Sequence, residues 1–209
     1  MRRRGGRPPR RDLGARATGS AAARLTLNYG LRFDELDAFR NENQVSPRVG
    51  LVWIPVEGTT FHAGYARYFS PPPFELVASE TVSRFAGTTA QAPGTQNDLP
   101  RSERDNYFDA GVEQKVGALT LGLDAYYKKA RNLVDEGQFG APIILTPFNY
   151  AEGYAKGVEF SANYVNGGFS AYGNFAVSQA KGRNIVSSQF NFDPGDLAVI
   201  AHQFIFLDH

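Results

Sequence analysis

The most constraining feature of this sequence is an alternation of apolar and polar residues that begins at Arg24 and recurs along the chain. A period of two is that of a β-strand with one apolar face, because successive side chains of a strand point to opposite sides. Seven such runs are present, an eighth begins at Gln203, and we expect an all-β, antiparallel structure. The apolar faces of the seven runs are Leu25, Leu27, Tyr29, Leu31 and Phe33; Val49, Leu51 and Trp53; Phe61, Ala63, Tyr65 and Phe69; Phe108, Ala110, Val112 and Val116; Leu119, Leu121, Leu123 and Tyr127; Val158, Phe160, Ala162 and Tyr164; and Phe169, Ala171, Phe175 and Val177.

The connections between these runs alternate between short and long. If neighbouring strands are antiparallel, the short turns all fall at one end of the strands and the long loops at the other. This arrangement is typical of outer-membrane β-barrels, which have short periplasmic turns and long extracellular loops. The short connections are 55–58, the residues around Gly117, and 166–168; the long ones are about 36–44, 70–104, 130–153 and 180–202.

The length of the runs separates a membrane barrel from a soluble β-sandwich. Soluble strands average about five or six residues, whereas these runs last roughly 10 to 13, near what a tilted strand needs to cross the hydrocarbon. Charges in mid-strand, such as Glu113, Asp124 and Glu159, suit a water-filled interior. The sequence has no apolar window of about 18 residues, so a transmembrane helix is excluded. We expect a transmembrane β-barrel segment of about eight long strands.

Residues 1–23 differ in composition from the rest of the chain. They hold seven Arg, one Asp and no apolar periodicity, so we expect a disordered Arg-rich leader, followed by a partial outer-membrane β-barrel over residues 24–209. The leader lacks the apolar stretch of about 7 to 15 residues that a secretory signal needs. A nucleic-acid-binding or membrane-binding arm is the alternative for it. Residues 24–209 carry an excess of acidic side chains, which disfavours a nucleic-acid-binding surface there.

Catalytic and metal-binding motifs are scarce. The chain has no Cys and three His, and neither G-x-S-x-G nor H-E-x-x-H occurs. We therefore expect no enzyme activity, no catalytic residue, no cofactor and no metal. Three weak patterns remain. Ser178–Lys181 matches S-x-x-K, and His202, Asp208 and His209 are weak candidates for metal ligands. The adjacent carboxylates Asp34/Glu35 and Asp135/Glu136 point in opposite directions in extended chain, so neither forms an acid/base pair.

Three cations interrupt the apolar faces at the long-loop end. Arg67, Lys129 and Lys156 each continue an apolar face in that direction. A long basic side chain can keep its charge at the membrane surface while its stem lies on apolar groups. Our hypothesis is that these residues contact outer-membrane lipid, specifically the phosphates of lipopolysaccharide. The alternative is that the sheet already protrudes into water at this level.

Two loop segments have local signals of their own. Ser70–Phe74 contains three consecutive prolines, which favour polyproline II at the exit of a strand, with a docking peptide as the alternative. Asp193–Asp196 precedes apolar residues spaced as in a helix, which predicts one or two helical turns capped by Asp196.

These segments resemble the barrel of TonB-dependent outer-membrane receptors, over roughly residues 24–209. Each motif is degenerate, and their order and spacing make the resemblance fairly specific. It rests on Ser46–Trp53 (SPRVGLVW), Thr60–Phe69 (TFHAGYARYF), Pro71–Glu75 (PPPFE), Arg104–Val116 (RDNYFDAGVEQKV), Leu121–Asn132 (LGLDAYYKKARN) and Tyr154–Phe160 (YAKGVEF).

The resemblance implies a 22-stranded barrel around an N-terminal plug, which imports iron chelates, cobalamin or other scarce solutes with energy from the TonB complex. This sequence departs from that pattern: it has no plug, which is the part that would contact TonB, it has about eight strands, and it lacks a terminal aromatic residue. An open arc of eight strands leaves two unpaired edges, and a closed barrel of eight has room only for side chains. We therefore expect a fragment of a receptor that does not transport alone.

The expected location is the outer membrane and the expected ligand a small solute. A small closed barrel with a structural or adhesive role, and a soluble carbohydrate-binding β-sandwich, remain alternatives. No motif nominates a ligand-binding residue, and Ser79–Asn97 and Gln138–Tyr150 are the segments in which to search for ligand contacts.

Overall fold

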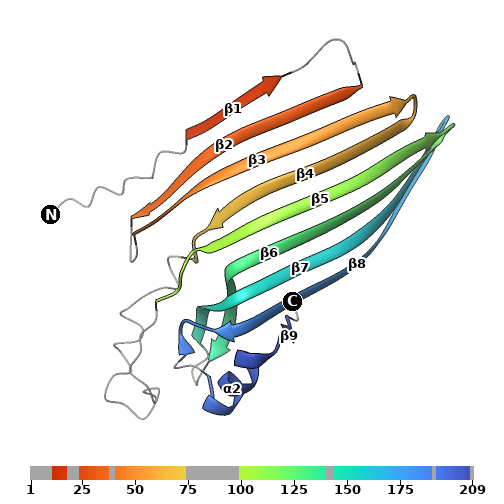
Figure 1. Cartoon of the computed structure of the whole chain (residues 1–209). Coiled ribbons are helices and arrows are strands. Elements are labelled where there is room, and N and C mark those ends of the chain that lie inside the picture. Colours follow the sequence, from red (N-terminus) through yellow and green to blue (C-terminus); the bar gives the residue numbers. More distant parts are fainter. Residues whose placement is uncertain are drawn as a thin grey trace.

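A computed structural model describes residues 11–17, 24–37, 41–73, 99–139, 144–189 and 192–207, with backbone alone for 11–17, 138–139 and 144–145. Figure 1 shows one curved antiparallel sheet in which every strand pairs with its sequence neighbours, in the order β1 to β9. A helix, α2, lies between the last two strands. The elements are β1 (Arg11–Ala17), β2 (Leu25–Asp37), β3 (Asn41–Val56), β4 (Thr59–Ser70), β5 (Glu103–Val116), β6 (Leu119–Phe139), β7 (Ile144–Asn166), β8 (Phe169–Ile185), α2 (Pro194–His202) and β9 (Ile205–Phe206).

The predicted strands are confirmed. The seven alternating runs lie in β2 to β8, and the eighth run contains β9. Three tight hairpins join β3 to β4, β5 to β6 and β7 to β8, and each holds a glycine with positive φ: Gly58 (82°), Gly117 (61°) and Gly167 (58°). Glycine is suited to these positions because it has no Cβ to clash in the left-handed region.

The interpretation of residues 1–23 as disordered is wrong for Arg11–Ala17. These residues form β1, which pairs with β2 from Arg11 opposite Phe33 to Ala17 opposite Leu27. The physical reason is that β2 presents a row of backbone N–H and C=O groups at its edge, and a neighbouring chain can pair with them through its own backbone. Such pairing needs no apolar periodicity, so composition gave no signal for it.

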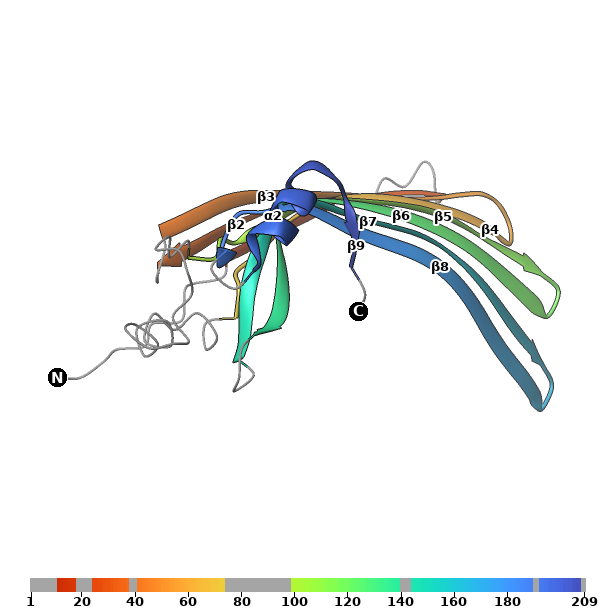
Figure 2. The same ribbon diagram turned by 90° about the horizontal axis from the view of Figure 1, so that it is seen from below.

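The strands at the long-loop end are longer than expected. β2 and β3 pair as far as Asp37 opposite Asn41, and β6 and β7 as far as Phe139 opposite Ile144. The predicted loop 130–153 is therefore mostly paired strand. Asn132 (φ 53°) in β6 and Asn184 (φ 59°) in β8 both adopt the left-handed conformation. They lie on either side of β7 between Tyr150 and Glu152, where the extension begins. Figure 2 shows the outer parts of β6 and β7 turning sharply away from the sheet.

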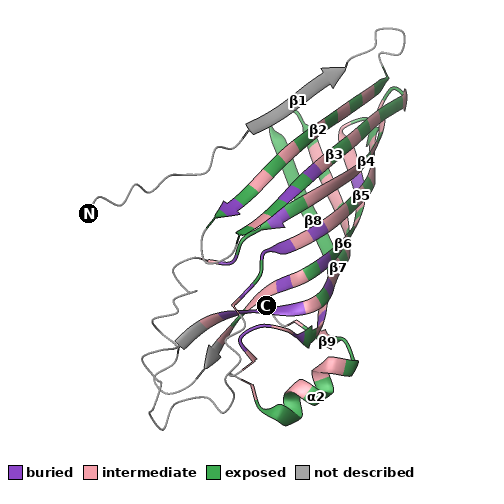
Figure 3. Ribbon diagram, turned by 60° about the vertical axis from the view of Figure 1, so that its left-hand side comes forward, coloured by how far each residue is buried: buried purple, intermediate pink, exposed green. Residues whose placement is uncertain are grey.

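The burial of the two faces is the reverse of that in a soluble sheet. The apolar positions of β2 to β8 form what we call the outer face, and large side chains on it are exposed: Leu31 by 55%, Phe160 by 45% and Phe175 by 67%. The polar positions form the inner face, where most side chains of β2 to β6 are half-buried, as the alternating bands in Figure 3 show. Curvature crowds side chains on a concave surface, so the inner face is the concave one.

The hydrophobic core is small and lies at the long-loop end. It consists of Ala130, Leu133, Phe148, Tyr150 and Ile185, with side chains of α2 and β9 packed against it. Because the apolar residues of the strands face outward, this core stabilises only the long-loop end of the sheet and the helix beside it. No helix in the described residues is long and apolar enough to cross a membrane.

Helix α2 confirms the predicted helical insert but not its predicted cap. The N-cap is Asp193, whose Oδ1 accepts a hydrogen bond from the backbone N–H of Gly195 at 2.7 Å. Pro194 follows at the first helical position, where its missing N–H costs nothing. Asp196 lies inside the first turn, where its charge favours the helix dipole.

Candidate functional site on the inner face

A histidine–carboxylate pair lies in the middle of the inner face. His62 of β4 and Asp124 of β6 are separated by the intervening strand β5, yet His62 Nε2 is 2.9 Å from Asp124 Oδ1. The two side chains meet above Gly111, which pairs with both residues in the sheet register. A Cβ at Gly111 would collide with both side chains. The absence of a side chain at this position therefore allows the pair to form.

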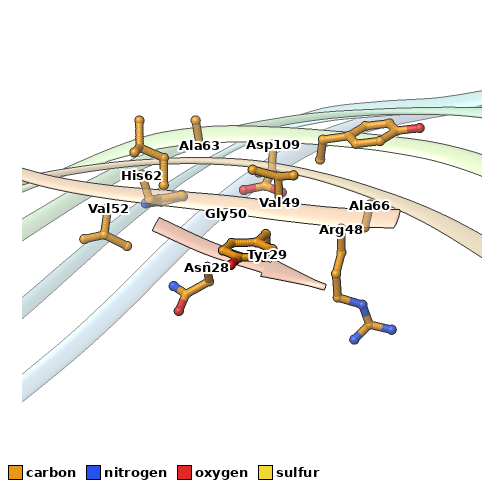
Figure 4. Close-up of a pocket in the computed structure, with 13 residues that line it drawn as sticks. Asn28, Tyr29, Arg48, Val49, Gly50, Val52, His62, Ala63, Ala66 and Asp109 are labelled. Atoms are coloured by element: carbon orange, nitrogen blue, oxygen red, sulfur yellow. The ribbon is translucent and has the colours of Figure 1, made fainter. Parts of the chain in front are cut away.

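Beside this pair the sheet has a shallow hollow of about 390 Å³. Its floor contains Gly50 and Gly64, which are opposite each other in β3 and β4. An added Cβ at Gly50 would meet no atom within 4 Å. Asn28, Arg48, His62 and Asp109 contribute polar side chains to its lining, and Figure 4 shows them around Gly50. The hollow thus offers hydrogen-bond donors and acceptors beside apolar surface. No metal-ligating cluster occurs among the described residues.

Three tyrosines form a diagonal row on the inner face above the hollow. The rings of Tyr68 and Tyr107 meet edge to face at 6.1 Å between centroids, and those of Tyr107 and Tyr126 stack at 6.0 Å. Gly157 makes room for this row, because a Cβ there would contact the Tyr126 ring at 2.6 Å. Tyr68 is 41% exposed, so the row offers ring surface to a molecule inside the curve of the sheet.

A buried charge cluster lies beyond the tyrosines at the long-loop end. Lys128 Nζ is 2.8 Å from Glu103 Oε1 and 3.8 Å from Asp105 Oδ2. Glu103 also accepts a hydrogen bond from the backbone N–H of Val134 at 2.7 Å, which ties the cluster to the bent part of β6. Asp105 Oδ1 has no hydrogen-bond partner among the described residues. Lys128 is therefore shared unequally between the two carboxylates.

This unequal sharing shifts the pKa of Asp105. Burial, together with the hydrogen bond and negative charge of Glu103, raises the pKa of Asp105 to about 7. Burial lowers the pKa of Lys128, but Glu103 and Asp105 outweigh it and hold that pKa above its ordinary value. The outward-facing neighbours of Asp105 are Arg104 and Asn106, so this part of β5 lies outside the apolar belt, by which we mean the band of apolar side chains on the outer face. In the extension of β7, burial and then the charge of Asp135 raise the pKa of Tyr150 to about 12.

We predict that Asp105→Asn stabilises the long-loop end at pH 8.5 and not at pH 5. Because the pKa of Asp105 is higher in the folded state than its ordinary 3.8, the stability that this group contributes is present at low pH and is lost between about pH 4 and pH 7. The neutral amide avoids that loss, with an expected gain of roughly 1 to 2 kcal/mol. Hydrogen exchange at the Val134 amide measures it, with Asp109→Asn on the same strand face as the control. Equal effects of Asp105→Asn at both pH values would refute the prediction.

Asn149 joins three segments at the same end. Its Oδ1 accepts hydrogen bonds from the Arg101 backbone N–H at 2.7 Å and the Ser187 hydroxyl at 2.8 Å. Its Nδ2 donates to the backbone carbonyls of Arg101 at 3.0 Å and Asn132 at 2.8 Å. The side chain is completely buried. Asn149 thus fixes the segment before β5 and the segment after β8 to the bend of β6.

The segments expected to hold ligand contacts have a different role where they are described. Ser79–Asn97 lies outside the described residues. In Gln138–Tyr150, Phe148 and Tyr150 are buried in the core and Asn149 in the network above. These aromatics therefore contribute packing, whereas Tyr68 has an exposed ring on the inner face. The sequence analysis did not single out Tyr68, Tyr107 or Tyr126, although their alternation with Phe69, Phe108 and Tyr127 places them on the polar face.

The weak catalytic patterns are not brought together. Ser178 pairs with Gly157 on the inner face, whereas Lys181 lies on the outer face with Nζ 4.0 Å from the Phe206 ring centroid. Asp34 accepts hydrogen bonds from Arg32 and Ser46 and so is part of the inner-face network. His202 is in the last turn of α2, and residues 208–209 lie outside the described part.

Comparison with known proteins identifies the family. The sequence profile described as "TonB dependent receptor-like, beta-barrel" matches residues 10–204. The chain belongs to this family. As expected for the barrel of a TonB-dependent receptor, it consists of long antiparallel strands with short turns at one end. No curated protein matched.

Two solved structures share the fold of this TonB-dependent receptor chain. Both are the FrpB iron transporter from Neisseria meningitidis. The apoprotein of the F5-1 variant is 16% identical with a TM-score of 0.54, covering 81% of this chain and 25% of the transporter. The F3-3 variant is 17% identical with a TM-score of 0.56, covering 82% and 25%. This chain therefore spans about a quarter of the length of those transporters.

Proposed function

We propose that this chain forms part of the wall of a TonB-dependent transporter in the outer membrane, where it lines the passage for a scarce solute such as an iron chelate or a vitamin. The observation that carries this proposal is the reversed burial of the sheet. Exposed Leu, Phe, Val and Tyr side chains cover the outer face of β2 to β8, and polar side chains crowd the inner face. Hydrocarbon outside and water inside would satisfy both faces.

The same observation weighs against a soluble β-sandwich. In a sandwich the apolar face of each strand is buried against a second sheet, but the described residues contain one sheet, and its apolar face is uncovered. A soluble protein with a contiguous apolar surface of this size would aggregate. The carbohydrate-binding sandwich is therefore not favoured.

The edges of the sheet support a role within a larger barrel. Among the described strands, β1 and β9 do not pair with each other, and β9 covers β8 only at Lys181 and Gly182. The edge of β8 from Phe169 to Gln179 has no partner strand in the described residues. Unpaired backbone groups are costly in hydrocarbon, which favours pairing with further strands over a small closed barrel. We propose that transport requires those strands and a plug that contacts TonB.

The tyrosine row is our candidate for solute contact. Tyr68 is exposed on the inner face, Tyr107 and Tyr126 are half-buried beside it, and the hollow adjoins them. Planar aromatic groups bind to such rings by stacking. The row is also rigid, because it is built on three neighbouring strands.

The test is uptake by a receptor-deficient strain that carries the coding sequence extended to the limits of its reading frame. The probes are ferric catecholate, ferric hydroxamate, ferric citrate, haem and cyanocobalamin. We expect accumulation of one probe, dependent on TonB, and none with the 209-residue chain alone. Tyr107→Ala should reduce accumulation about tenfold, whereas Tyr127→Ala on the outer face should leave it unchanged. Failure to accumulate any probe with the protein present in the outer membrane would overturn the proposal.

A further inference from the structure

Five cations gather on the outer face at the long-loop end of β6, β7 and β8. We call them the outer cationic patch: Lys129, Arg131, Lys156, Lys181 and Arg183. The register places Lys129 and Lys181 on either side of Tyr154, and Arg131 and Arg183 on either side of Glu152. Lys156 pairs with Tyr127 one step nearer the apolar belt. From strand spacing and rise, the patch measures about 10 Å across and about 13 Å along the strands.

Sequence reasoning found only part of this group. Arg67, Lys129 and Lys156 were selected as interruptions of apolar faces, but Arg67 lies on β4, two strands away from β6. Lys181 and Arg183 were missed, because they lie in the segment that was assigned to a loop. The register of β7 with β8 brings them beside Lys129 and Arg131.

Aromatic rings lie beneath the charged ends of the patch. Lys181 Nζ is 4.0 Å from the Phe206 centroid, Arg183 Cζ is 4.7 Å from that of Phe204, and Lys156 Nζ is 5.8 Å from that of Tyr154. Tyr127, Tyr154 and Phe204 continue as a chain of ring contacts. The stems of these cations therefore lie on an amphipathic aromatic surface that continues into the apolar belt, as expected at the boundary between hydrocarbon and headgroups.

The patch has an excess of positive charge. Among the outward-facing positions of β6 up to Arg131, of β7 from Glu152 and of β8, Glu152 is the one acidic residue, and it is 2.7 Å from Arg183. The outward positions of β2 to β8 nearer the short turns carry no charge in the described strands; Trp53, Phe61 and Phe169 stand there instead. The outward charges at the long-loop end of β2, Glu35 and Asp37, are acidic, so the excess of cations is confined to a part of the sheet that includes β6 to β8. A strand end that simply protruded into water would not need such a cluster, whereas a bound anionic group would.

We propose that the outer cationic patch binds the phosphorylated headgroup of a lipid A molecule in the outer leaflet, with its acyl chains against the apolar residues below. Two phosphates on a diglucosamine headgroup fit a patch of this extent, and the acyl chains explain why the aromatic surface adjoins the cations. The inference rests on the proposed location in the outer membrane, and it adds a defined lipid partner to the proposed function.

The test uses the protein encoded by the coding sequence extended to the limits of its reading frame, and compares its retention of two lipids in nonionic micelles by native mass spectrometry. One lipid is bisphosphorylated lipid A and the other is the same molecule without phosphates. We expect at least tenfold greater retention of the phosphorylated form. The triple variant Lys129→Gln, Lys156→Gln, Lys181→Gln should lose about 100-fold, since each basic residue near an anionic membrane surface contributes roughly fivefold. The control, Arg48→Gln with Lys115→Gln, removes cations from the inner face and should bind as the unmodified chain does.

Each outcome bears on the proposal. Equal retention of both lipids by the unmodified chain would overturn it. This outcome does not depend on whether any variant folds. So would equal losses in the triple variant and the control, or displacement of lipid A by millimolar inorganic phosphate alone. Flotation with phosphatidylcholine vesicles separates the two levels of inference: a chain that does not insert contradicts the membrane location and the lipid site together, whereas a chain that inserts without phosphate preference contradicts the lipid site alone.

Discussion

Val177→Arg is expected to destabilise the protein encoded by the extended reading frame, folded in lipid vesicles, by about 2 to 4 kcal/mol, the cost of a basic side chain near the bilayer midplane. Val177 is 60% exposed on the outer face of β8 and pairs with Val158. In water such a substitution at an exposed position changes stability by less than about 0.5 kcal/mol. Urea unfolding in vesicles, followed by the circular dichroism of the β-structure, measures the difference.

The neighbouring substitution Ala176→Arg is the matched control. It introduces the same side chain one residue away, on the inner face, where Ala176 pairs with Glu159. We expect a change near zero or a slight gain. If the two variants have the same free energy of unfolding, the outer face does not contact hydrocarbon and the proposed membrane location is wrong.

Asn149→Ala is expected to cost about 3 kcal/mol at the long-loop end, since each buried polar group left without a partner costs about 1 to 3 kcal/mol. The substitution removes four side-chain hydrogen bonds and leaves groups of Arg101, Asn132 and Ser187 unpaired. The loss should be local, because the paired strands below do not depend on this residue. Hydrogen exchange should accelerate at 99–102 and 186–188 and remain unchanged in β4.

Asn163→Ala is the control for this prediction. Asn163 is on the same strand, exposed near the short turn, and its removal should change exchange in neither segment. Equal protection of 99–102 in Asn149→Ala and the unmodified chain would show that another contact holds this segment, and would contradict the central role given to Asn149.

The fold could be predicted where the sequence alternates between apolar and polar residues, and not elsewhere. The outer face of every strand from β2 to β8 follows from alternation alone, and the turns at Gly117 and Gly167 follow from glycine. The extension of β6 and β7 was missed because residues beyond Asn132 pack against a small core and no longer alternate. β1 was missed because edge pairing uses the backbone and leaves no pattern in the sequence.

The candidate sites required the register, which a single sequence does not specify. His62 and Asp124 are 62 residues apart and meet only because β5 places Gly111 between them. The burial of Asp105 and the gathering of Lys181 and Arg183 beside Lys129 likewise come from strand pairing. What the sequence does specify within its alternating runs is the face on which a residue lies. His62 and Asp124 are on the predicted polar face and Lys129 continues the apolar one, whereas Lys181 and Arg183 lie in a segment that was assigned to a loop.

The topology of the sheet also determines how it can be made. Every pair of neighbouring strands is adjacent in the sequence, so no pairing waits for a distant part of the chain. Closing a short loop costs little entropy compared with bringing together remote segments. The sheet can therefore grow by one hairpin at a time, and at each stage the growing end presents a single unpaired strand as the template for the next. β8 is such a strand, and its open edge is where growth would continue.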